Sequence, residues 1–145
     1  MTVKDILDLR LSAWADLRHR LDLSDNPFDE IIMFWNAVPY CAHNPNIDPY
    51  NQFGWPTPWE IIAENIHDDF TKALMMGYTV LLTDKFKDCV VELRTLVDND
   101  RKRLYNIIVV DNHWVLNFND EHYVLLDSIP SLYRLENHIT LDRPR

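Results

Sequence analysis

Residues able to act as nucleophiles or bases are few in this 145-residue sequence. The clearest are Cys41, which stands two residues before His43, and the run His67-Asp68-Asp69. A thiol with an imidazole in reach could serve a hydrolase or transferase, because the histidine takes the thiol proton and the thiolate attacks. No cation or helix N-terminus that would lower the thiol pKa stands beside Cys41 in the sequence. We therefore keep Cys41, with His43 or His67, as an alternative nucleophile.

The same region offers nitrogen and oxygen ligands to a metal ion. The candidate ligands are His43, Asp48, His67, Asp68 and Asp69. Their spacing matches neither a zinc-finger nor an EF-hand pattern, and adjacent residues on a helix do not face one another. The chain also has only two glycines and no glycine-rich phosphate loop. We predict no metal site and no cofactor.

The stretch Gly54–Leu82 is expected to organise the elements that position these residues. Thr57, followed by Pro58 and Glu60, has the capping-box spacing and predicts a short helix to about Ala63. A second helix is predicted from Asp68 or Asp69 to Leu82, because apolar residues recur there at steps of three and four. Its apolar face is so wide that we expect the most buried helix of the molecule, with Gly77 kept for close packing of a neighbour.

Two further helices and a long loop are predicted in the first half of the chain. The apolar stripe Ile6, Leu9, Ala13, Trp14, Leu17 and Leu21 predicts an amphipathic helix over Thr2–Leu21. A strongly apolar helix from about Phe28 should stop before Pro39. Asn, Asp and Pro dominate Tyr40–Phe53, which favours an irregular loop. We expect Trp55 and Trp59 to pin that loop over the core.

From Asp88 onward the hydrophobic pattern has a period of two residues, which is typical of strands. The predicted strands are Cys89–Asp98, Arg103–Val110, His113–Phe118, His122–Asp127 and Asn137–Leu141, with a helical turn within Ser128–Leu135. Asp111-Asn112 is suited to a tight hairpin. The sequence thus predicts a single α+β domain over residues 1–145. Residues 1–82 would be mainly helical with a loop at 40–55, and N-terminal helices would pack on a C-terminal antiparallel meander at 88–141.

A central helix followed by an antiparallel sheet resembles the core of transglutaminase-like and papain-like cysteine hydrolases. In transglutaminase-like domains a Cys begins the central helix, a His follows on the next strands, and an Asp comes just after a W-x-x-L-D type strand. Here the corresponding runs are His67-Asp68-Asp69-Phe70-Thr71, Tyr105-Asn106 and Trp114-Val115-Leu116-Asn117. The resemblance, which covers Trp55 to Asn117, implies triad positions at His67, Tyr105 and Asn117 and a relative without the catalytic triad.

Charge and aromatic residues are concentrated in one part of the sequence. The formal net charge is −9, and no Lys or Arg occurs between Arg20 and Lys72. That interval also holds a large share of the aromatic residues, including Trp55 and Trp59. The negative electrostatic potential of such an acidic region disfavours direct nucleic-acid binding and suits a protein partner with a basic surface. The expected binding residues are Trp55, Trp59, Glu60, Glu64, Asp68 and Asp69.

The segments GWPTPWEII and LVDNDRKRLYNIIVVDNHWVLNF also resemble small uncharacterised proteins of tailed bacteriophages. This resemblance implies a phage accessory protein made in the cytoplasm of the infected host. The leading hypothesis is a non-enzymatic protein that binds a host or phage protein through the acidic, aromatic-rich surface. One alternative is a cysteine- or metal-assisted hydrolase or transferase. The other is a structural homodimer joined through the helix Thr2–Leu21. No membrane segment is predicted, because no apolar run approaches the length of a span.

Overall fold

The computed structural model describes residues 1–145, with helices first and strands afterwards as predicted. The helices are α1 (Val3–Leu21), α2 (Pro27–Asn36), α3 (Pro58–Glu64) and α4 (Asp69–Leu82). The strands are β1 (Val91–Asp98), β2 (Arg103–Val110), β3 (Trp114–Leu116), β4 (Val124–Leu125) and β5 (Arg134–Thr140). Short 3₁₀ turns lie at Gln52–Gly54, Asp84–Phe86 and Leu126–Ser128. Between α2 and α3 the chain is irregular, which confirms the predicted loop.

Side-chain caps fix where three of the helices begin. Thr2 and Asp5 form a reciprocal capping box at the start of α1, and Thr57 and Glu60 form another at the start of α3. Asp68 caps α4 by accepting a hydrogen bond from the backbone N–H of Thr71. Each cap satisfies backbone N–H groups that have no partner inside the helix. The predicted starts of these helices are therefore confirmed.

The strands form one antiparallel sheet in the order β4-β3-β2-β1-β5. The β2–β3 hairpin turns at Asp111 and Asn112, whose φ angles are 50° and 54°. The backbone N–H of His113 donates to the oxygen of Val110 across this turn, and positive φ at its two central residues gives a twist that suits the flanking strands. Because Val110 pairs with Trp114, three residues separate the strands and not the two that were predicted. The last strand, β5, pairs with β1 at one edge of the sheet, so that β1 lies between β2 and β5.

Several strand predictions are corrected by the structure. β3 and β4 are shorter than expected, and β5 begins at Arg134, within the segment for which a helical turn was predicted. The turn occurs earlier, at Leu126–Ser128. The predicted alternation of β1 holds: Thr95 bonds Asn106 on the face toward α4, whereas Leu96 packs with Ile107 on the opposite face, and both are buried because both faces are covered. The pairing of β1 with β5 shifts register between Thr95 and Leu96, and the extra residue, Glu136, lies in β5.

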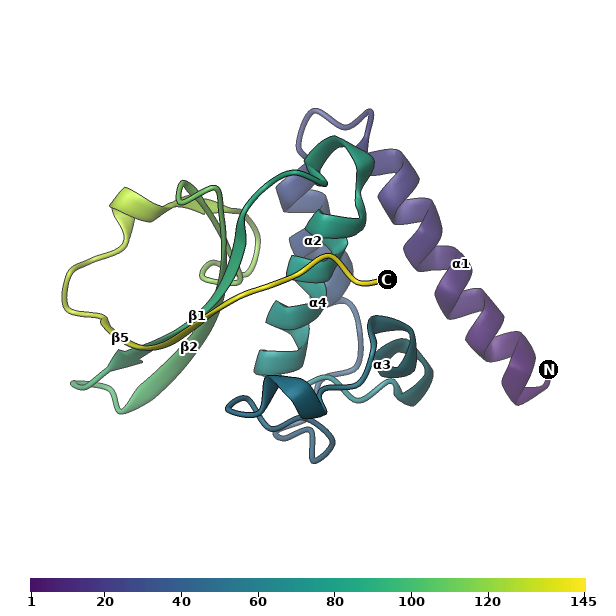
Figure 1. Cartoon of the computed structure of the whole chain (residues 1–145), viewed down its shortest axis with the longest axis horizontal. Coiled ribbons are helices and arrows are strands. Elements are labelled where there is room, and N and C mark those ends of the chain that lie inside the picture. The colour runs from purple at the N-terminus through teal and green to yellow at the C-terminus, as the bar shows by residue number, and fades with distance from the viewer.

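Helix α4 is the centre of the fold, as predicted, and it lies between the sheet and the other helices (Figure 1). One side packs on β1 and β2, and the other on α2, so that all but three of its residues are buried. The close contact with the sheet depends on Gly77. A Cβ atom there would lie 2.6 Å from Cδ1 of Leu141 and 2.9 Å from Cδ1 of Ile108. The expectation that Gly77 permits close packing is confirmed.

A second, smaller apolar cluster covers the opposite face of the sheet. Its buried members are Leu96, Ile107, Val109 and Val115, and Tyr105, Phe118 and Tyr133 pack against them. Along β2, Ile107 and Val109 of this cluster alternate with Ile108 and Val110, which belong to the main core against α4. Both faces of the central strands are therefore covered.

Helix α1 forms the edge of the molecule farthest from the sheet (Figure 1). Trp14, Leu17 and Leu21 are buried, so the C-terminal half of the predicted stripe does pack on the core. In the N-terminal half the predicted residues Ile6 and Leu9 are exposed, and Leu7 and Leu11 pack against the core instead. The prediction was therefore wrong about which side of this half of α1 faces the core, and the helix packs against α3 and α2. None of the helices has the length and apolar character needed to cross a membrane.

Candidate functional site

The first residue of α4, Asp69, is held by two side-chain amides from the sheet. Asn106 on β2 donates to Oδ2 at 2.9 Å, and Asn117, directly after β3, donates to Oδ1 at 3.2 Å. Asn117 also donates to the backbone oxygen of Asn106 at 2.7 Å. Its φ of 69° lies in the left-handed region that Asn tolerates better than most residues. Asp69, Asn106 and Asn117, here called the Asp69 cluster, thus link the helix N-terminus to two strands.

The Asp69 cluster occupies the three places at which the family resemblance puts a triad: the start of the central helix, the next strands and the residue after the Trp114 strand. Of the predicted set His67, Tyr105 and Asn117, only Asn117 is in the cluster. Successive side chains of a strand point to opposite faces, so Asn106 faces α4 while the ring of Tyr105 packs with Phe118 and Tyr133. His67 precedes the cap of α4 and turns into a different cavity. The alternation of Ile108 and Val110 with Ile107 and Val109 could have indicated Asn106.

A polar cleft of about 340 Å³ opens over this cluster. Asp69 and Asn117 line it, together with the cations Lys72 and Arg103. Lys72, whose residue is only 8% exposed, places Nζ 5.2 Å from the ring centre of Tyr40 and forms no salt bridge. The guanidinium of Arg103 lies 4.7 Å from the ring centre of Tyr105. The cleft lined by Asp69, Asn117, Lys72 and Arg103 is called the Asp69 cleft.

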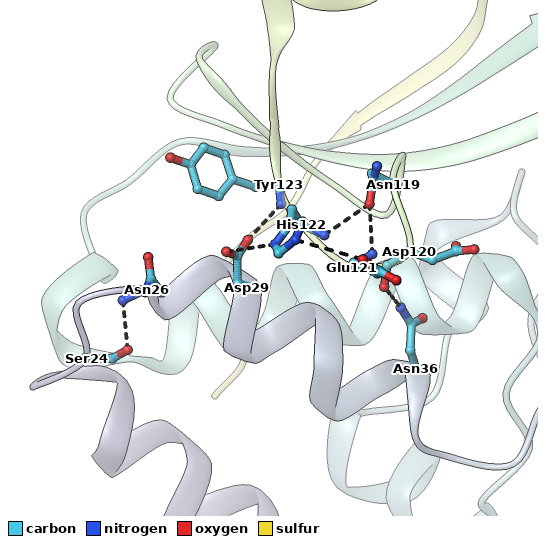
Figure 2. A network of polar contacts seen from close by, with 9 residues as sticks. All are labelled: Ser24, Asn26, Asp29, Asn36, Asn119, Asp120, Glu121, His122 and Tyr123. Atoms are coloured by element: carbon cyan, nitrogen blue, oxygen red, sulfur yellow. Dashed lines mark hydrogen bonds and ion pairs between the residues drawn. The ribbon is translucent and has the colours of Figure 1, made fainter.

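One wall of the Asp69 cleft is fastened to α2 by the loop Asn119–Tyr123 (Figure 2). The amide of Asn36 donates to the backbone oxygen of Asp120 at 2.7 Å, and both residues line the cleft. Toward the other end of α2, Asp29 accepts a hydrogen bond from the backbone N–H of Tyr123 at 2.9 Å and contacts Nδ1 of His122 at 3.2 Å. The loop is therefore held at two points along one helix, which fixes the width of the cleft on that side.

The six binding residues expected from the sequence do not form one accessible acidic face. Asp68 and Asp69 are half-buried, with both oxygens of each carboxylate engaged in hydrogen bonds. Glu60 and Glu64 are exposed, although Glu60 completes the α3 capping box and Glu64 accepts a hydrogen bond from Asn46. Asp68 and Asp69 face inward because α4 begins against buried Asn44 on one side and the sheet on the other.

The two tryptophans of that set have different partners. Trp55 stacks edge-on against Phe70 and donates through Nε1 to the backbone oxygen of Asp48 at 2.7 Å. It pins the loop, as predicted. Trp59 instead packs on Trp14 of α1, with ring centres 6.1 Å apart. The corrected role of Trp59 is to join α3 to α1.

Neither cysteine is paired with a histidine side chain. The Sγ atom of Cys41 lies 3.5 Å from the backbone oxygen of His43, to which it donates. The backbone N–H of Cys41 donates to the backbone oxygen of His67 at 2.9 Å. Cys89 lies before β1, where burial, with a hydrogen bond to Asp111 and its charge, raises the thiol pKa to about 11. No group of three or more His, Cys, Asp or Glu side chains is arranged to hold a metal ion.

His67 is 1% exposed and stacks against Trp35, with ring centres 5.7 Å apart. Burial lowers its pKa to about 4, with the positive charges of Lys72 and Arg10 acting in the same direction and Asp68 in the opposite one. The imidazole is therefore neutral at pH 7. A group with this pKa is a weak proton acceptor at neutral pH, and no nucleophile is bonded to it.

Comparison with solved structures finds Legionella pneumophila LapG, with a TM-score of 0.65, 16% identity, and coverage of 96% of this chain and 84% of LapG. The calcium-bound form of LapG gives a TM-score of 0.66 at 15% identity and the same coverage. The EGTA-treated form gives 0.52 at 18% identity, covering 93% of this chain and 74% of that chain. No protein-family model matches the sequence, and no curated protein is similar to it in sequence. The fold is thus the predicted transglutaminase-like α+β fold, and at this identity the likeness establishes the fold alone.

Proposed function

We propose that this chain is a non-catalytic protein of transglutaminase-like fold that binds a segment of another polypeptide in the Asp69 cleft. The observation that carries the proposal is the state of Asp69. The side chain at the start of the central helix is a carboxylate, and each of its oxygens accepts a hydrogen bond from an amide. In the resemblance described above, a thiol nucleophile belongs at that position.

The Asp69 cluster lacks the chemistry of a triad. A triad needs a nucleophile whose proton moves to a base held by a third group. Asn106 and Asn117 carry amides, which do not take a proton at neutral pH. The other thiol candidate, Cys41, donates to a backbone oxygen and has no imidazole bonded to it. The cluster is better suited to hold α4 against the sheet and to form the floor of a binding cleft.

The lining of the Asp69 cleft indicates what it would bind. Lys72 and Arg103 are cations without an acidic partner within 4 Å, and the rings of Tyr40, Tyr105 and Phe118 lie beside them. Carboxylates complement the cations, and aromatic side chains complement the rings. The cleft also holds Asp69, whose oxygens accept bonds from the two amides, and Asp120, so it is the part beside Lys72 and Arg103 that favours an acidic segment with an aromatic residue. An acidic partner segment differs from the basic partner that the net charge led us to expect. Only the exposed acids Glu60 and Glu64 still support a basic partner.

A displayed library of random short peptides, selected on the wild-type protein, tests the binding proposal. Selected peptides should be enriched in Asp, Glu and aromatic residues. Fluorescence polarisation should show about tenfold weaker binding to Lys72→Met, which keeps the apolar stem of the side chain but removes the charge. Lys87→Met, at an exposed position outside the cleft, should bind as wild type. If the selected peptides were basic instead, and if Glu60→Gln and Glu64→Gln weakened their binding, the acidic surface would be the binding site and the cleft proposal would be contradicted.

The hydrolase alternative has its own measurement. Incubation of the protein with casein and with the selected peptides, followed by mass spectrometry, should show no cleavage and no acyl transfer. Cleavage by the wild type that is lost in Cys41→Ser, with the circular dichroism spectrum unchanged, would replace the binding proposal by a cysteine hydrolase. The same assay on His67→Phe would tell whether that histidine assists.

Self-association through α1 is a second candidate function. Val3 and Leu9 on the N-terminal half of the helix are 85% and 57% exposed, and Ile6 lies between them. A homodimer would bury these side chains between two copies of α1. Sedimentation equilibrium should then give a mass that rises with concentration for the wild type and stays monomeric for Leu9→Lys. A monomer at all concentrations would exclude this alternative.

The biological setting proposed here is that of a phage accessory protein acting in the cytoplasm of an infected host. Its support is the resemblance of GWPTPWEII and LVDNDRKRLYNIIVVDNHWVLNF to small proteins of tailed bacteriophages. The partner would then be a host or phage protein. The net charge of −9 argues against direct contact with nucleic acid.

A further inference from the structure

A second cavity, of about 120 Å³, opens between α1, α2 and α3 and lies apart from the Asp69 cleft. Its walls are mainly apolar, with Trp14 and Ala13 from α1, Phe34 and Trp35 from α2, and Ile62 from α3. The indole N–H groups of Trp14 and Trp35 both donate to Thr79 Oγ1 at 3.0 Å, which fixes the two rings from behind. The cavity therefore has rigid walls that a small apolar group could contact without rearranging the core.

The polar lining of the cavity consists of Arg10, Asn65 and His67, and no Asp or Glu side chain lines it. Arg10 donates through Nη1 to the backbone oxygen of Ala63 at 3.4 Å and forms no salt bridge. A guanidinium has five N–H donors in a fixed fork, so most of its donor capacity stays free. In a chain with a net charge of −9, a half-buried arginine without an acidic partner is notable.

His67 adds an independent observation. Its Nδ1 atom is enclosed and has no hydrogen-bond partner, although buried polar side-chain atoms are usually bonded. The neutral ring carries one N–H, and a ligand oxygen would have to reach the ring at Nε2, because Nδ1 is enclosed. Because the pKa of His67 is lowered, its ring stays neutral at pH 7, and Arg10 is the only positive charge that lines the cavity. Arg10, Asn65 and His67 are therefore the polar residues that line the cavity, and all three carry hydrogen-bond donors.

We propose that this cavity binds a small apolar monocarboxylate. Its hydrocarbon body would lie between Trp14, Trp35 and Ile62, and its carboxylate would accept hydrogen bonds from Arg10 and from the neighbouring polar side chains. Such a ligand matches both halves of the lining, because it buries apolar surface and places a single negative charge beside an unpaired guanidinium. The site is independent of the Asp69 cleft and of the function proposed for it.

Size limits the ligand to about one ring or a short branched chain. An engineered apolar protein cavity of about 150 Å³ holds one benzene molecule. The present cavity is somewhat smaller, at about 120 Å³, so it suits the ring of benzoate or the branched chain of isovalerate with the carboxylate left at the opening. The cavity is open on one side, which lets the carboxylate keep part of its hydration. With so few contacts we expect a Kd on the order of millimolar for a simple probe.

The test is a titration of the ¹⁵N-labelled protein with sodium benzoate, followed through the five tryptophan indole signals. The signals of Trp14 and Trp35 should move and saturate, while that of Trp114, which lies outside this cavity, should not move. Benzyl alcohol, which has a similar ring but no charge, should bind about tenfold more weakly, and benzylammonium should not bind. Equal affinity for benzoate and benzyl alcohol would overturn the carboxylate assignment, and an absence of saturable shifts would overturn the site.

Three variants separate the roles of charge and volume. Arg10→Gln should remove the preference for benzoate over benzyl alcohol, whereas Arg20→Gln removes the same charge from an exposed position of α1 and should keep it. Ala13→Leu should fill the cavity from α1 and abolish binding of both probes. Thermal unfolding of each variant reports whether it is folded. Because Ala13 is exposed, Ala13→Leu provides a test of the site even if Arg10→Gln is too unstable to use.

Discussion

The side-chain amide of Asn117 donates a hydrogen bond of 3.2 Å to the carboxylate of Asp69, across 48 residues of sequence. It joins the residue after β3 to the first residue of the central helix. Together with the hydrogen bond from Asn106, it engages both oxygens of the Asp69 carboxylate. The family resemblance implies a nucleophile at the start of this helix. This relationship is the reason for proposing binding, and not bond cleavage, as the function of the cleft.

Replacing Asp69 should destabilise the protein even though the residue is only half-buried. Asp69→Ala would leave the amides of Asn106 and Asn117 without their acceptor, and we expect a loss of about 2–3 kcal/mol in the free energy of unfolding. Urea denaturation followed by circular dichroism measures it. Asp120→Ala, in the same cleft but with an exposed carboxylate, is the control and should change stability by less than about 0.5 kcal/mol. Equal effects would show that Asp69 has no special structural role.

Thr79 is expected to be one of the most sensitive polar positions of the core. Its hydroxyl accepts hydrogen bonds from the indoles of Trp14 and Trp35 and donates to the backbone oxygen of Met75. Thr79→Val keeps the shape but leaves two buried N–H groups unpaired, at a cost of about 2–4 kcal/mol. Thr83→Val is the matched control, since its hydroxyl has only a bond to the backbone oxygen of Thr79. A smaller loss for Thr79→Val than for Thr83→Val would contradict the assigned bonds.

Gly77 should tolerate one methyl group better than a branched side chain. A Cβ would meet the terminal methyl groups of the buried Leu141 and Ile108, which would have to shift, whereas Ala gains about 1 kcal/mol in helix propensity, so Gly77→Ala should have a small net cost of about 1 kcal/mol. Gly77→Val adds two more methyl groups against the sheet and should cost about 2–3 kcal/mol. Thermal denaturation of the pair measures the difference. Equal stability of both variants would mean that the sheet can move away from α4.

The low pKa of His67 predicts an acid-sensitive fold. In the unfolded chain the imidazole takes a proton near its ordinary pKa of 6.5, whereas in the folded protein it does so only near 4. Between these values the unfolded state binds more protons, so the free energy of unfolding falls as the pH decreases from about 6.5 to 4. The loss from this residue should reach at most about 3 kcal/mol.

Urea denaturation at several pH values, with His67→Phe beside the wild type, measures that contribution. The variant keeps an aromatic ring but cannot titrate, so its stability should fall less over the same range. His43→Phe, which removes an exposed histidine, serves as the matched control and should follow the wild type. Parallel curves for the wild type and His67→Phe would show that His67 is not responsible for acid sensitivity.

The raised pKa of Cys89 predicts slow alkylation. In Cys41→Ser the remaining thiol should react slowly with iodoacetamide at pH 7, because little of it is thiolate when the pKa is about 11. The rate should rise about tenfold for each pH unit up to at least pH 9.5. Mass spectrometry of quenched samples gives the rates. A rate that levels off below pH 9 would mean that burial and Asp111 do not raise this pKa.

Local chemistry let the sequence predict much of the fold. The capping pairs Thr2–Asp5 and Thr57–Glu60 each span three residues, and the Asp111-Asn112 turn spans two, so each could be recognised without the rest of the chain. The period of apolar residues likewise identified α4 as the central helix. Strand ends were predicted less well, because Arg134–Thr140 forms a strand only through pairing with β1.

The candidate sites depended on contacts between distant residues. The sequence by itself determined that a helix would start at Asp68 or Asp69 and that Asn117 would lie in or beside a strand over His113–Phe118. Only the tertiary structure decided that Asp69, and not His67, meets the sheet, since its partners Asn106 and Asn117 lie 37 and 48 residues away. It likewise decided that His67 faces a cavity beside Arg10, which comes from another helix. Helix and turn signals act over a few residues, whereas the chemistry of a site depends on which side chains packing brings within hydrogen-bond distance.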